Sequence, residues 1–221
     1  MSHPGLVIFG CDGVLVDSEP ISMRELTRAI NAVDVPMSED EVHATFVGGS
    51  MELIERELTR RRGAALPASW GDDFYAARAV AFERELEPVQ GARAAVEAVQ
   101  AAGWETCIAS QGRPAKMAQT LALTSLDDLF PPQRIFSATQ VARAKPAPDL
   151  FLLAASSCGF APLHCVVVED SLLGVRGARA AAMRVLGYVP RDSPEDAALS
   201  LIAAGAEVIR SIGDVAGRLK A

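Results

Sequence analysis

The sequence has no long hydrophobic run and no excess of positive charge. Its first apolar run, Leu6 to Phe9, is short, so we expect neither a signal peptide nor a membrane span, each of which needs a longer apolar segment. Lys and Arg number 21 against 28 Asp and Glu, which gives a formal charge of −7. A net acidic surface repels a phosphate backbone, and this argues against general nucleic-acid binding.

Several motif classes are also absent. No GxGxxG follows the first apolar run and no GxxxxGK[ST] occurs, which argues against a dinucleotide-binding or P-loop protein. The chain has three histidines and no GxSxG elbow, so Ser-His-Asp hydrolysis has no support. The four cysteines are scattered without CxxC or metal-finger spacing, and three lie in or beside apolar runs (Cys11, Cys107, Cys158, Cys165). We therefore expect buried thiols in a reducing, cytoplasmic compartment.

What is present is a globular composition, with 50% hydrophobic and 22% charged residues, in which short apolar runs alternate with helical patterns. We expect strands at Leu6–Phe9, Thr106–Ala109, Ile135–Ser137, Cys165–Val168, Val185–Tyr188 and Val208–Ile209. Helices are expected at Ala92–Ala102, Pro194–Ala204 and near Ile212–Leu219. Continuously apolar strands separated by helices predict an α/β protein with a doubly wound, Rossmann-like parallel sheet.

One stretch between the first two predicted strands carries only helical patterns. Ser38 and Glu41 have capping-box spacing, Ser50 is expected to cap a further helix, and another helix is expected over about 72–84. We therefore predict an α/β core made of residues 1–16 and 88–221, into which residues 17–87 are inserted as a helical cap domain.

Polar residues that chemistry could use stand at four places near the ends of predicted strands. Taken alone, each of these places has an ordinary structural interpretation. Asp12-Gly13 is a turn dipeptide, and Ser110-Gln111-Gly112 is a typical cap and turn. Lys145 alone is a solvated charge, and Asp149 is expected to be an N-cap. Asp170 or Ser171 is expected to cap the helix after Glu169. Together, however, these positions lie at the carboxyl ends of strands, where the sites of doubly wound folds are found.

The segments FGCDGVLVDSEP, IASQG, ARAKPAPDLF and VVVEDSLLGVRGA, in this order and spacing, resemble the motifs of the haloacid dehalogenase-like hydrolase superfamily. The chain is most similar to the helical-cap branch that holds sugar-phosphate phosphatases, phosphoglycolate phosphatase and β-phosphoglucomutase. The resemblance implies a magnesium-dependent phosphomonoester hydrolase that forms an aspartyl-phosphate on small phosphorylated metabolites. A dehalogenase is a weaker match because that branch works without a metal and has no need of Glu169 and Asp170.

The resemblance also implies roles for individual residues. Asp12 matches the general acid and base, Ser110 a hydroxyl that binds the phosphoryl group, and Lys145 the ammonium that neutralises developing charge. Magnesium is expected on Glu169, Asp170, the Asp12 carbonyl and position 10. The expected substrate-binding residues are Gln111, Gly112, Gly48, Gly49 and Glu19.

Position 10 departs from this pattern, because Gly10 stands where the family has its nucleophilic Asp. Glycine can neither attack phosphorus nor give magnesium a carboxylate, and strand alternation points Cys11 to the other face. Three explanations are open: an engineered or cloning substitution in an active enzyme, a natural loss giving a phosphate-binding and metal-binding pseudoenzyme, or slow attack by water. We favour an active phosphatase ancestry with recent or artificial loss.

Two residues bear on the alternative of a β-phosphoglucomutase-like phosphotransferase. Ser22 and Met51 stand at positions where the mutases carry a histidine and an arginine that grip a second phosphate. Neither side chain can clamp a dianion, which favours a phosphatase. The expected partner is a small phosphorylated metabolite, with no nucleic acid and no membrane; the sequence leaves the specific substrate and the oligomeric state open.

Overall fold

The computed structural model describes residues 4–46 and 49–219. The chain divides into two compact units. The core unit spans Met1–Asp17 and Glu87–Ala221, and the helical unit spans Ser18–Leu86.

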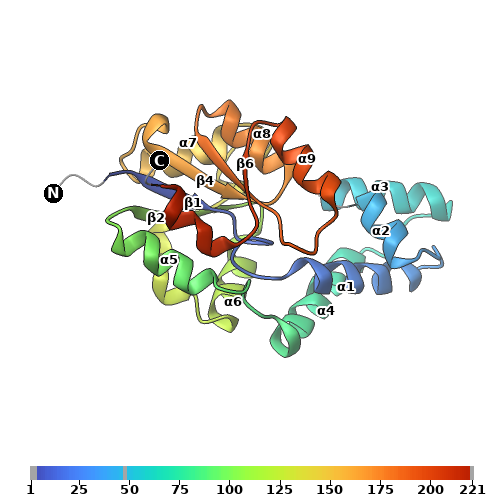
Figure 1. The fold of residues 1–221 in the computed structure, drawn as a ribbon. Helices are drawn as coiled ribbons and strands as arrows, with labels where there is room; N and C mark the ends of the chain where they lie inside the picture. The colour runs from blue at the N-terminus through green and yellow to red at the C-terminus, as the bar shows by residue number, and fades with distance from the viewer. Residues whose placement is uncertain (1–3, 47–48, 220–221) are drawn as a thin grey trace. The chain divides into compact units, whose positions relative to one another are not determined.

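The core unit is built on a parallel sheet in the order β3-β2-β1-β4-β5-β6 (Figure 1). Its strands are β1 (Leu6–Phe9), β2 (Glu105–Ser110), β3 (Ile135–Ser137), β4 (Cys165–Glu169), β5 (Arg184–Tyr188) and β6 (Glu207–Ile209). Each predicted strand is confirmed to within one residue at either end. The central strands are buried along their whole length, since helices cover both faces of the sheet.

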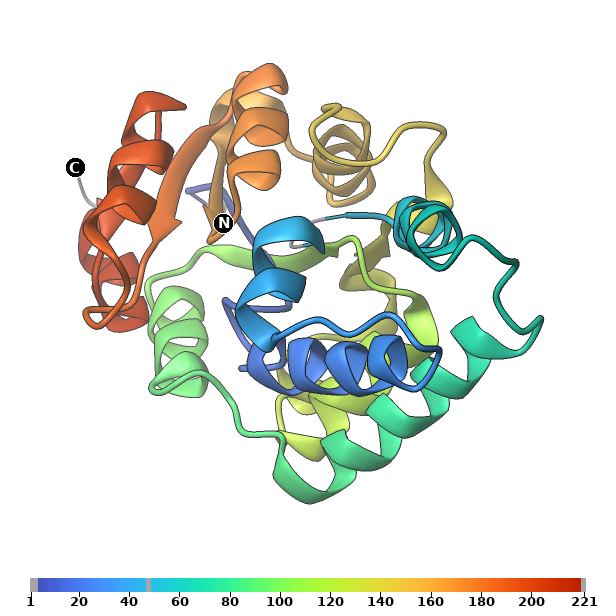
Figure 2. The same ribbon diagram turned by 90° about the vertical axis from the view of Figure 1, so that its right-hand side faces the viewer.

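The helices that cover the sheet lie in two layers, which Figures 1 and 2 show above and below it. Helices α7 (Asp149–Ser157), α8 (Leu172–Ala180) and α9 (Glu195–Ala203) lie on one face. Helices α5 (Ala92–Ala101) and α6 (Pro114–Leu123) lie on the other, with the short α10 (Val215–Arg218) in contact with α5. Buried side chains of α7, α8 and α9 form one apolar cluster with β1, β2, β4 and β5. The doubly wound α/β fold predicted from the sequence is confirmed.

Three predicted helix ends are wrong in detail. Asp149 is the first residue of α7 and not its N-cap, because its carboxylate accepts two hydrogen bonds from the Arg143 guanidinium at 2.8 and 3.1 Å, a stronger partner than backbone amides. Pro194 is the N-cap of α9 and not its first residue. The helix expected near Ile212–Leu219 begins as a 3₁₀ turn, since the Ser211 hydroxyl accepts from the Gly213 N–H, and only then becomes α10.

The strand order reverses at β1, which pairs with β2 on one side and β4 on the other. The Gly10 N–H donates to the Val168 carbonyl at 2.8 Å, and this bond continues the β1–β4 ladder past the end of β1. The next residues form a tight turn in which Leu15 N–H and Val16 N–H both donate to the Cys11 carbonyl. In doubly wound sheets, ligands bind outside the carboxyl ends of the strands at this reversal.

The chain leaves and re-enters the core unit through one short paired segment. Asp17 N–H donates to the Glu87 carbonyl at 3.0 Å, and Val89 N–H donates to the Leu15 carbonyl at 2.9 Å. An antiparallel bridge joins Val16 to Pro88 between them. These bonds fix the two connections to the helical unit beside the turn that follows β1.

The helical unit contains α1 (Glu19–Asn31), α2 (Glu39–Phe46), α3 (Met51–Arg62) and α4 (Trp70–Glu85), and its described residues contain no strand. The predicted capping box is confirmed, because Ser38 and Glu41 exchange hydrogen bonds between side chain and backbone. The predicted N-cap at Ser50 is also confirmed, because the Ser50 hydroxyl accepts from the Leu53 N–H at 3.3 Å. Trp70 packs in the buried cluster of this unit and donates its indole N–H to the Ala29 carbonyl.

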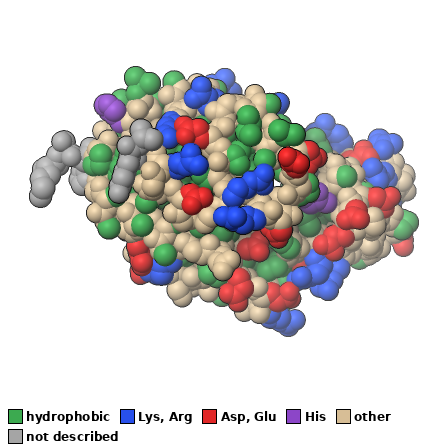
Figure 3. Space-filling model, in the orientation of Figure 1, with side chains coloured by type: hydrophobic (Ala, Val, Ile, Leu, Met, Phe, Trp, Pro, Cys, Tyr) green, Lys and Arg blue, Asp and Glu red, His purple; other side chains and the backbone are tan. Residues whose placement is uncertain are grey.

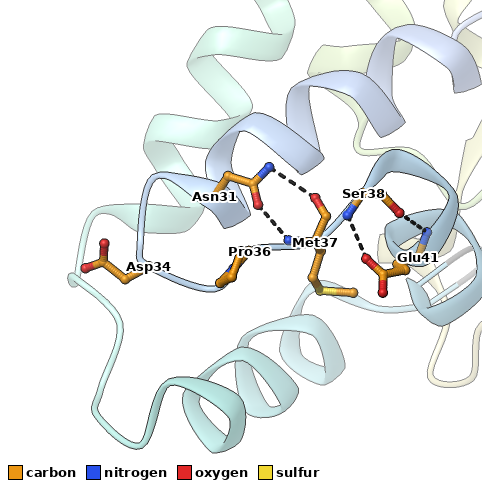
Figure 4. A pocket seen from close by; sticks show the side chains of 6 residues that line it. All are labelled: Asn31, Asp34, Pro36, Met37, Ser38 and Glu41. Atoms are coloured by element: carbon orange, nitrogen blue, oxygen red, sulfur yellow. Dashed lines mark hydrogen bonds between the residues drawn. The ribbon is translucent and has the colours of Figure 1, made fainter.

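The loop between α1 and α2 is held by one side chain (Figure 4). Asn31 accepts from the Met37 N–H at 2.8 Å and donates to the Met37 carbonyl at 3.1 Å, so both backbone groups of Met37 are satisfied. A cavity of about 630 Å³ opens beside this loop and is lined in part by Asp34 and Pro36. Because the polar atoms of Asn31 are already engaged, we attribute a loop-holding role to it.

Charges on the molecular surface are mixed in sign. Figure 3 shows acidic and basic side chains interspersed over the visible face. Several exposed carboxylates are paired with arginines, including Glu57 with Arg60 and Asp128 with Arg93. Such exposed pairs contribute little to stability. None of the helices in the described part of the chain is long and apolar enough to cross a membrane.

Replacing Leu150 tests whether the cluster beneath α7 stabilises the core unit. Leu150 is fully buried, so Leu150→Ala should lower the free energy of unfolding by about 2–5 kcal/mol through lost burial and a residual cavity. Leu152 lies on the same helix with 39% of its surface exposed. Leu152→Ala should therefore change the free energy of unfolding by about 0.5 kcal/mol or less. Urea unfolding followed by circular dichroism measures both. Equal effects would show that this cluster does not form.

Candidate active site

A buried ion pair lies at the carboxyl edge of the sheet. The Lys145 ammonium binds Glu169 Oε1 and also donates to the Ala109 carbonyl at 3.1 Å. The second oxygen of Glu169 accepts from the Ser171 hydroxyl at 3.0 Å. The side chains of Lys145 and Glu169 are only 5% and 3% exposed. Each charge is therefore compensated inside the protein, as buried charges must be.

The Glu169 carboxylate lies where a side chain at position 10 would extend. A Cβ added to Gly10 would be 3.4 Å from Glu169 Oε1 and 3.0 Å from a methyl group of Val14. The backbone of Gly10 does not have the left-handed conformation that favours glycine. Position 10 can therefore accept another residue if Val14 shifts by a few tenths of an ångström.

A second group of polar residues adjoins this ion pair. Asp12 binds the ammonium of Lys116, which lies in the first turn of α6. A Cβ added to Gly112 would be 3.3 Å from the Ser110 hydroxyl and 3.6 Å from Asp12 Oδ2. The Ser110 hydroxyl is itself buried and accepts from the Gly112 N–H at 3.0 Å. The predicted residues Asp12, Ser110 and Gly112 are thus brought together.

Lys116 was not among the residues predicted for the site. Its partner Asp12 is 104 positions away in the sequence, so spacing along the chain does not indicate the contact. The available signal is weaker: Lys116 follows the Ser110-Gln111-Gly112 turn by one helical turn. A basic residue in the first turn of a helix that starts beside a strand-end carboxylate can reach that carboxylate.

Asp170 approaches the same turn from β4. A Cβ added to Gly13 would be 1.8 Å from Asp170 Oδ2, so only glycine allows this approach. Gly13 also has a φ of 71°, a left-handed conformation that other residues rarely adopt. The turn after β1 therefore carries the Asp12 carboxylate and contacts the Asp170 carboxylate.

Of the other predicted substrate-binding residues that the structure describes, one lies on the turn after β2 and two lie in the helical unit. Gln111 is exposed on the turn after β2. Glu19 begins α1 in the helical unit, 3.8 Å from His43, and Gly49 is exposed between α2 and α3. Gly48 lies outside the described residues. Glu19 and Gly49 therefore belong to the helical unit.

Cys11 has the wrong chemistry for a nucleophile. Its thiol is fully buried, and burial, reinforced by the neighbouring Asp12 charge, raises its pKa to about 12. Deprotonation would be required for attack on phosphorus, and it is disfavoured at neutral pH. Cys11 therefore packs as an uncharged thiol.

The oxygen donors at this edge suit a divalent metal only in part. No group of three His, Cys, Asp or Glu side chains within residues 4–46 and 49–219 is arranged to hold a metal ion. Both Glu169 oxygens are engaged by Lys145 and Ser171, and Gly10 offers no carboxylate. Asp170 and the backbone carbonyl of Asp12 are further oxygen groups beside the turn. Mg²⁺ is commonly held by one or two carboxylates together with phosphate oxygens and water, so this set fits such a site.

Comparison with known proteins gives consistent matches. A family model described as haloacid dehalogenase-like hydrolase matches residues 4–182. The 6-phosphogluconate phosphatase of Escherichia coli (strain K12) is 30% identical over 197 residues, covering 88% of this chain and 87% of that protein.

Two solved structures have the same fold. A conserved haloacid dehalogenase-like protein of unknown function from Agrobacterium tumefaciens is 33% identical, with a TM-score of 0.83 over 98% of this chain and 97% of that one. A putative β-phosphoglucomutase from Thermotoga maritima is 25% identical, with a TM-score of 0.80 over 98% of both chains.

The buried ion pair can be tested without any substrate. Glu169→Gln should lower the free energy of unfolding by about 3–5 kcal/mol, since it leaves the Lys145 ammonium buried opposite a neutral amide. Adding Lys145→Met to Glu169→Gln removes that uncompensated charge and should recover much of the loss. Arg143→Gln, which breaks an exposed ion pair, should change little. Urea unfolding of the parent protein and the three variants measures these free energies. If Glu169→Gln left the free energy of unfolding unchanged, the buried pair would not be formed.

Proposed function

Because the chain belongs to the haloacid dehalogenase-like hydrolase family, we propose that it binds small phosphorylated metabolites at the carboxyl edge of its sheet, as a magnesium-dependent phosphomonoester hydrolase from which one group is missing. The observation that carries the proposal is the set of polar groups at the carboxyl ends of β1, β2 and β4. Lys145 pairs with Glu169 beside Gly10, Asp12 lies near Ser110, and Asp170 contacts the turn at Gly13. The binding and charge-stabilising groups are present, and the nucleophile is absent.

The roles we assign follow from the chemistry of each group. The Ser110 hydroxyl, which accepts from the Gly112 N–H, is the donor for a phosphoryl oxygen. The Lys145 ammonium supplies positive charge where negative charge develops during phosphoryl transfer. Asp12 gives a proton to the leaving oxygen and takes one from the attacking water, and Lys116 orients its carboxylate.

Magnesium would be held by Asp170 and the backbone carbonyl of Asp12, together with the phosphoryl group of the substrate. Glu169 would become a further ligand if its carboxylate turned away from Lys145. When bound, the ion would polarise the phosphoryl oxygens and neutralise part of their charge. Gly10 contributes backbone only, so we expect the affinity for the metal alone to be weak.

The missing carboxylate affects the covalent step. An aspartyl-phosphate requires a carboxylate directed at phosphorus, and Asp12 cannot attack while also serving as the acid. With Gly10, hydrolysis must proceed by direct attack of water, assisted by Asp12 as base. We therefore expect the protein to bind phosphate monoesters and to hydrolyse them very slowly.

We assign residues 1–16 and 88–221 as the catalytic core and residues 17–87 as a cap that selects the substrate. Glu19, Gly48 and Gly49 are the cap residues we expect to contact it. Similarity to the Escherichia coli 6-phosphogluconate phosphatase supports phosphorylated sugars or sugar acids as the substrate class. The free, buried Cys11, Cys107 and Cys165 support a reducing, cytoplasmic location.

Gly10→Asp should restore magnesium-dependent hydrolysis. Removing the nucleophile from another hydrolase costs about 10⁶ in turnover, so the gain should be several orders of magnitude. Gly10→Asn, which has the same shape without the charge, should stay at the level of the parent protein. Phosphate release from a panel of sugar phosphates and a chromogenic monoester measures all three.

Two results would contradict this account of position 10. Robust metal-dependent turnover by the Gly10 protein would mean that another group attacks phosphorus. A folded Gly10→Asp variant that binds phosphate but stays inert on the whole panel would favour a binding protein without hydrolysis.

Asp170→Asn should weaken magnesium binding about tenfold or more. Changing a residue that only orients a metal ligand already costs about this much affinity, and we expect Asp170 to be a ligand itself. Asp128→Asn removes an exposed carboxylate that is paired with Arg93, and should leave the affinity unchanged. Calorimetric titration of magnesium in the presence of inorganic phosphate compares the variants. Equal affinities in Asp170→Asn and the parent protein would place the metal elsewhere.

A further inference from the structure

Three thiols of the core unit lie in one apolar cluster, away from the carboxyl ends of the strands. Cys107 lies within β2, Cys165 is the first residue of β4, and Cys158 directly follows α7. Cys107 and Cys165 are buried, whereas Cys158 is half-buried. None of these residues takes part in the function proposed above.

The sheet register limits which of these thiols can join. Strand β1 lies between β2 and β4, with Ile8 beside Cys107 and Leu6 beside Cys165. Adjacent strands are about 4.8 Å apart, so the Cα atoms of Cys107 and Cys165 are separated by about 9.6 Å or more, beyond the roughly 7 Å limit for a disulfide. Cys158 and Cys107, by contrast, are side-chain neighbours, since α7 packs on β2 and both thiols belong to one apolar cluster.

Arg134 lies beside Cys158 and has one buried, unpaired nitrogen. Its Nη2 binds Glu105 at 2.9 Å, while its Nη1 is buried with no hydrogen-bond partner among residues 4–46 and 49–219. The same guanidinium is a neighbour of the Cys158 sulfur. A neutral thiol is a poor acceptor, whereas a thiolate would accept strongly from this N–H.

The surroundings of Cys158 favour its thiolate. The hydrogen bond from Cys107 and the nearby Arg134 guanidinium lower the pKa of Cys158 to about 6, against the opposing effects of burial and of Glu105. Burial raises the pKa of Cys107, which therefore stays protonated and donates to the thiolate. The titratable groups facing Cys158 are Cys107 and Glu105 on β2, Arg134 before β3, and Cys165 on β4.

We propose that Cys158 and Cys107 form a redox modification site that a peroxide oxidises to a disulfide. The Cys158 thiolate attacks one oxygen of the peroxide, the O–O bond breaks, and Cys158 becomes a sulfenic acid while hydroxide leaves and takes up a proton. The sulfur of Cys107 then attacks the Cys158 sulfur, and its proton leaves with the hydroxyl group as water. In total, two thiols and one hydrogen peroxide give one disulfide and two waters.

The test uses the reduced full-length protein and one equivalent of hydrogen peroxide. After alkylation of the remaining thiols, peptide mapping without reductant should find the Cys107–Cys158 disulfide in the parent protein and in Cys165→Ser. Cys107→Ser should instead accumulate a sulfenic acid at Cys158, trapped by a dimedone-type reagent. Cys158→Ser should leave Cys107 reduced.

The rate should also depend on pH and on Arg134. Oxidation should be half-maximal near pH 6, following the thiolate of Cys158, and not near the value of about 8.5 for an ordinary thiol. Arg134→Gln should slow the reaction severalfold at pH 6 and much less at pH 9, while Arg134→Lys, which keeps a positive charge, should react more like the parent protein.

Other outcomes would overturn the proposal. Oxidation of Cys158 no faster than that of Cys165 would show that its thiolate is not stabilised. A disulfide that joins any other pair, or a rate midpoint near pH 8.5, would show that Cys107 and Arg134 do not act on Cys158.

Discussion

The buried pair between Lys145 and Glu169 is the interaction on which the carboxyl edge of the sheet depends. Glu169 ends β4, and Lys145 belongs to the loop that enters α7 and also donates to the Ala109 carbonyl at the end of β2. One ammonium therefore links two strands and a loop at the point where the strand order reverses. Because neither charge is solvated, both must keep a partner, and the pair holds the loop before α7 at the carboxyl edge of the sheet.

The same pair explains how the molecule accommodates a glycine at position 10. Lys145 is compensated by Glu169, so the protein folds without a second carboxylate beside it. The Asp12 carboxylate is likewise paired with the Lys116 ammonium, which holds its orientation. A carboxylate restored at position 10 would have to share Lys145 with Glu169, and bound magnesium would help to hold two such anions together. In the function we propose, phosphate binding and covalent catalysis are separable: the first needs the groups that remain, and the second needs the one that is missing.

The sequence predicted the sheet well because continuous apolar runs such as Leu6–Phe9 and Cys165–Val168 leave few alternatives to buried parallel strands. It located Asp12, Ser110, Lys145 and Asp170 because strand ends of such a sheet converge. It could not give the pairings, since the contacts of Lys116 with Asp12 and of Arg134 with Cys158 join residues that are far apart in the chain. It also misjudged Asp149, because a local cap pattern cannot show that Arg143 competes for the same carboxylate.

We propose that position 10 alone separates this chain from covalent catalysis. Intact-protein mass spectrometry after rapid mixing with a reactive phosphate monoester and magnesium, followed by acid quenching, tests this proposal directly. We expect a single phosphoryl adduct on Gly10→Asp, located on residue 10 by peptide mapping, and none on the Gly10 protein. An adduct on the Gly10 protein, at Asp12, Glu169 or any other residue, would contradict it.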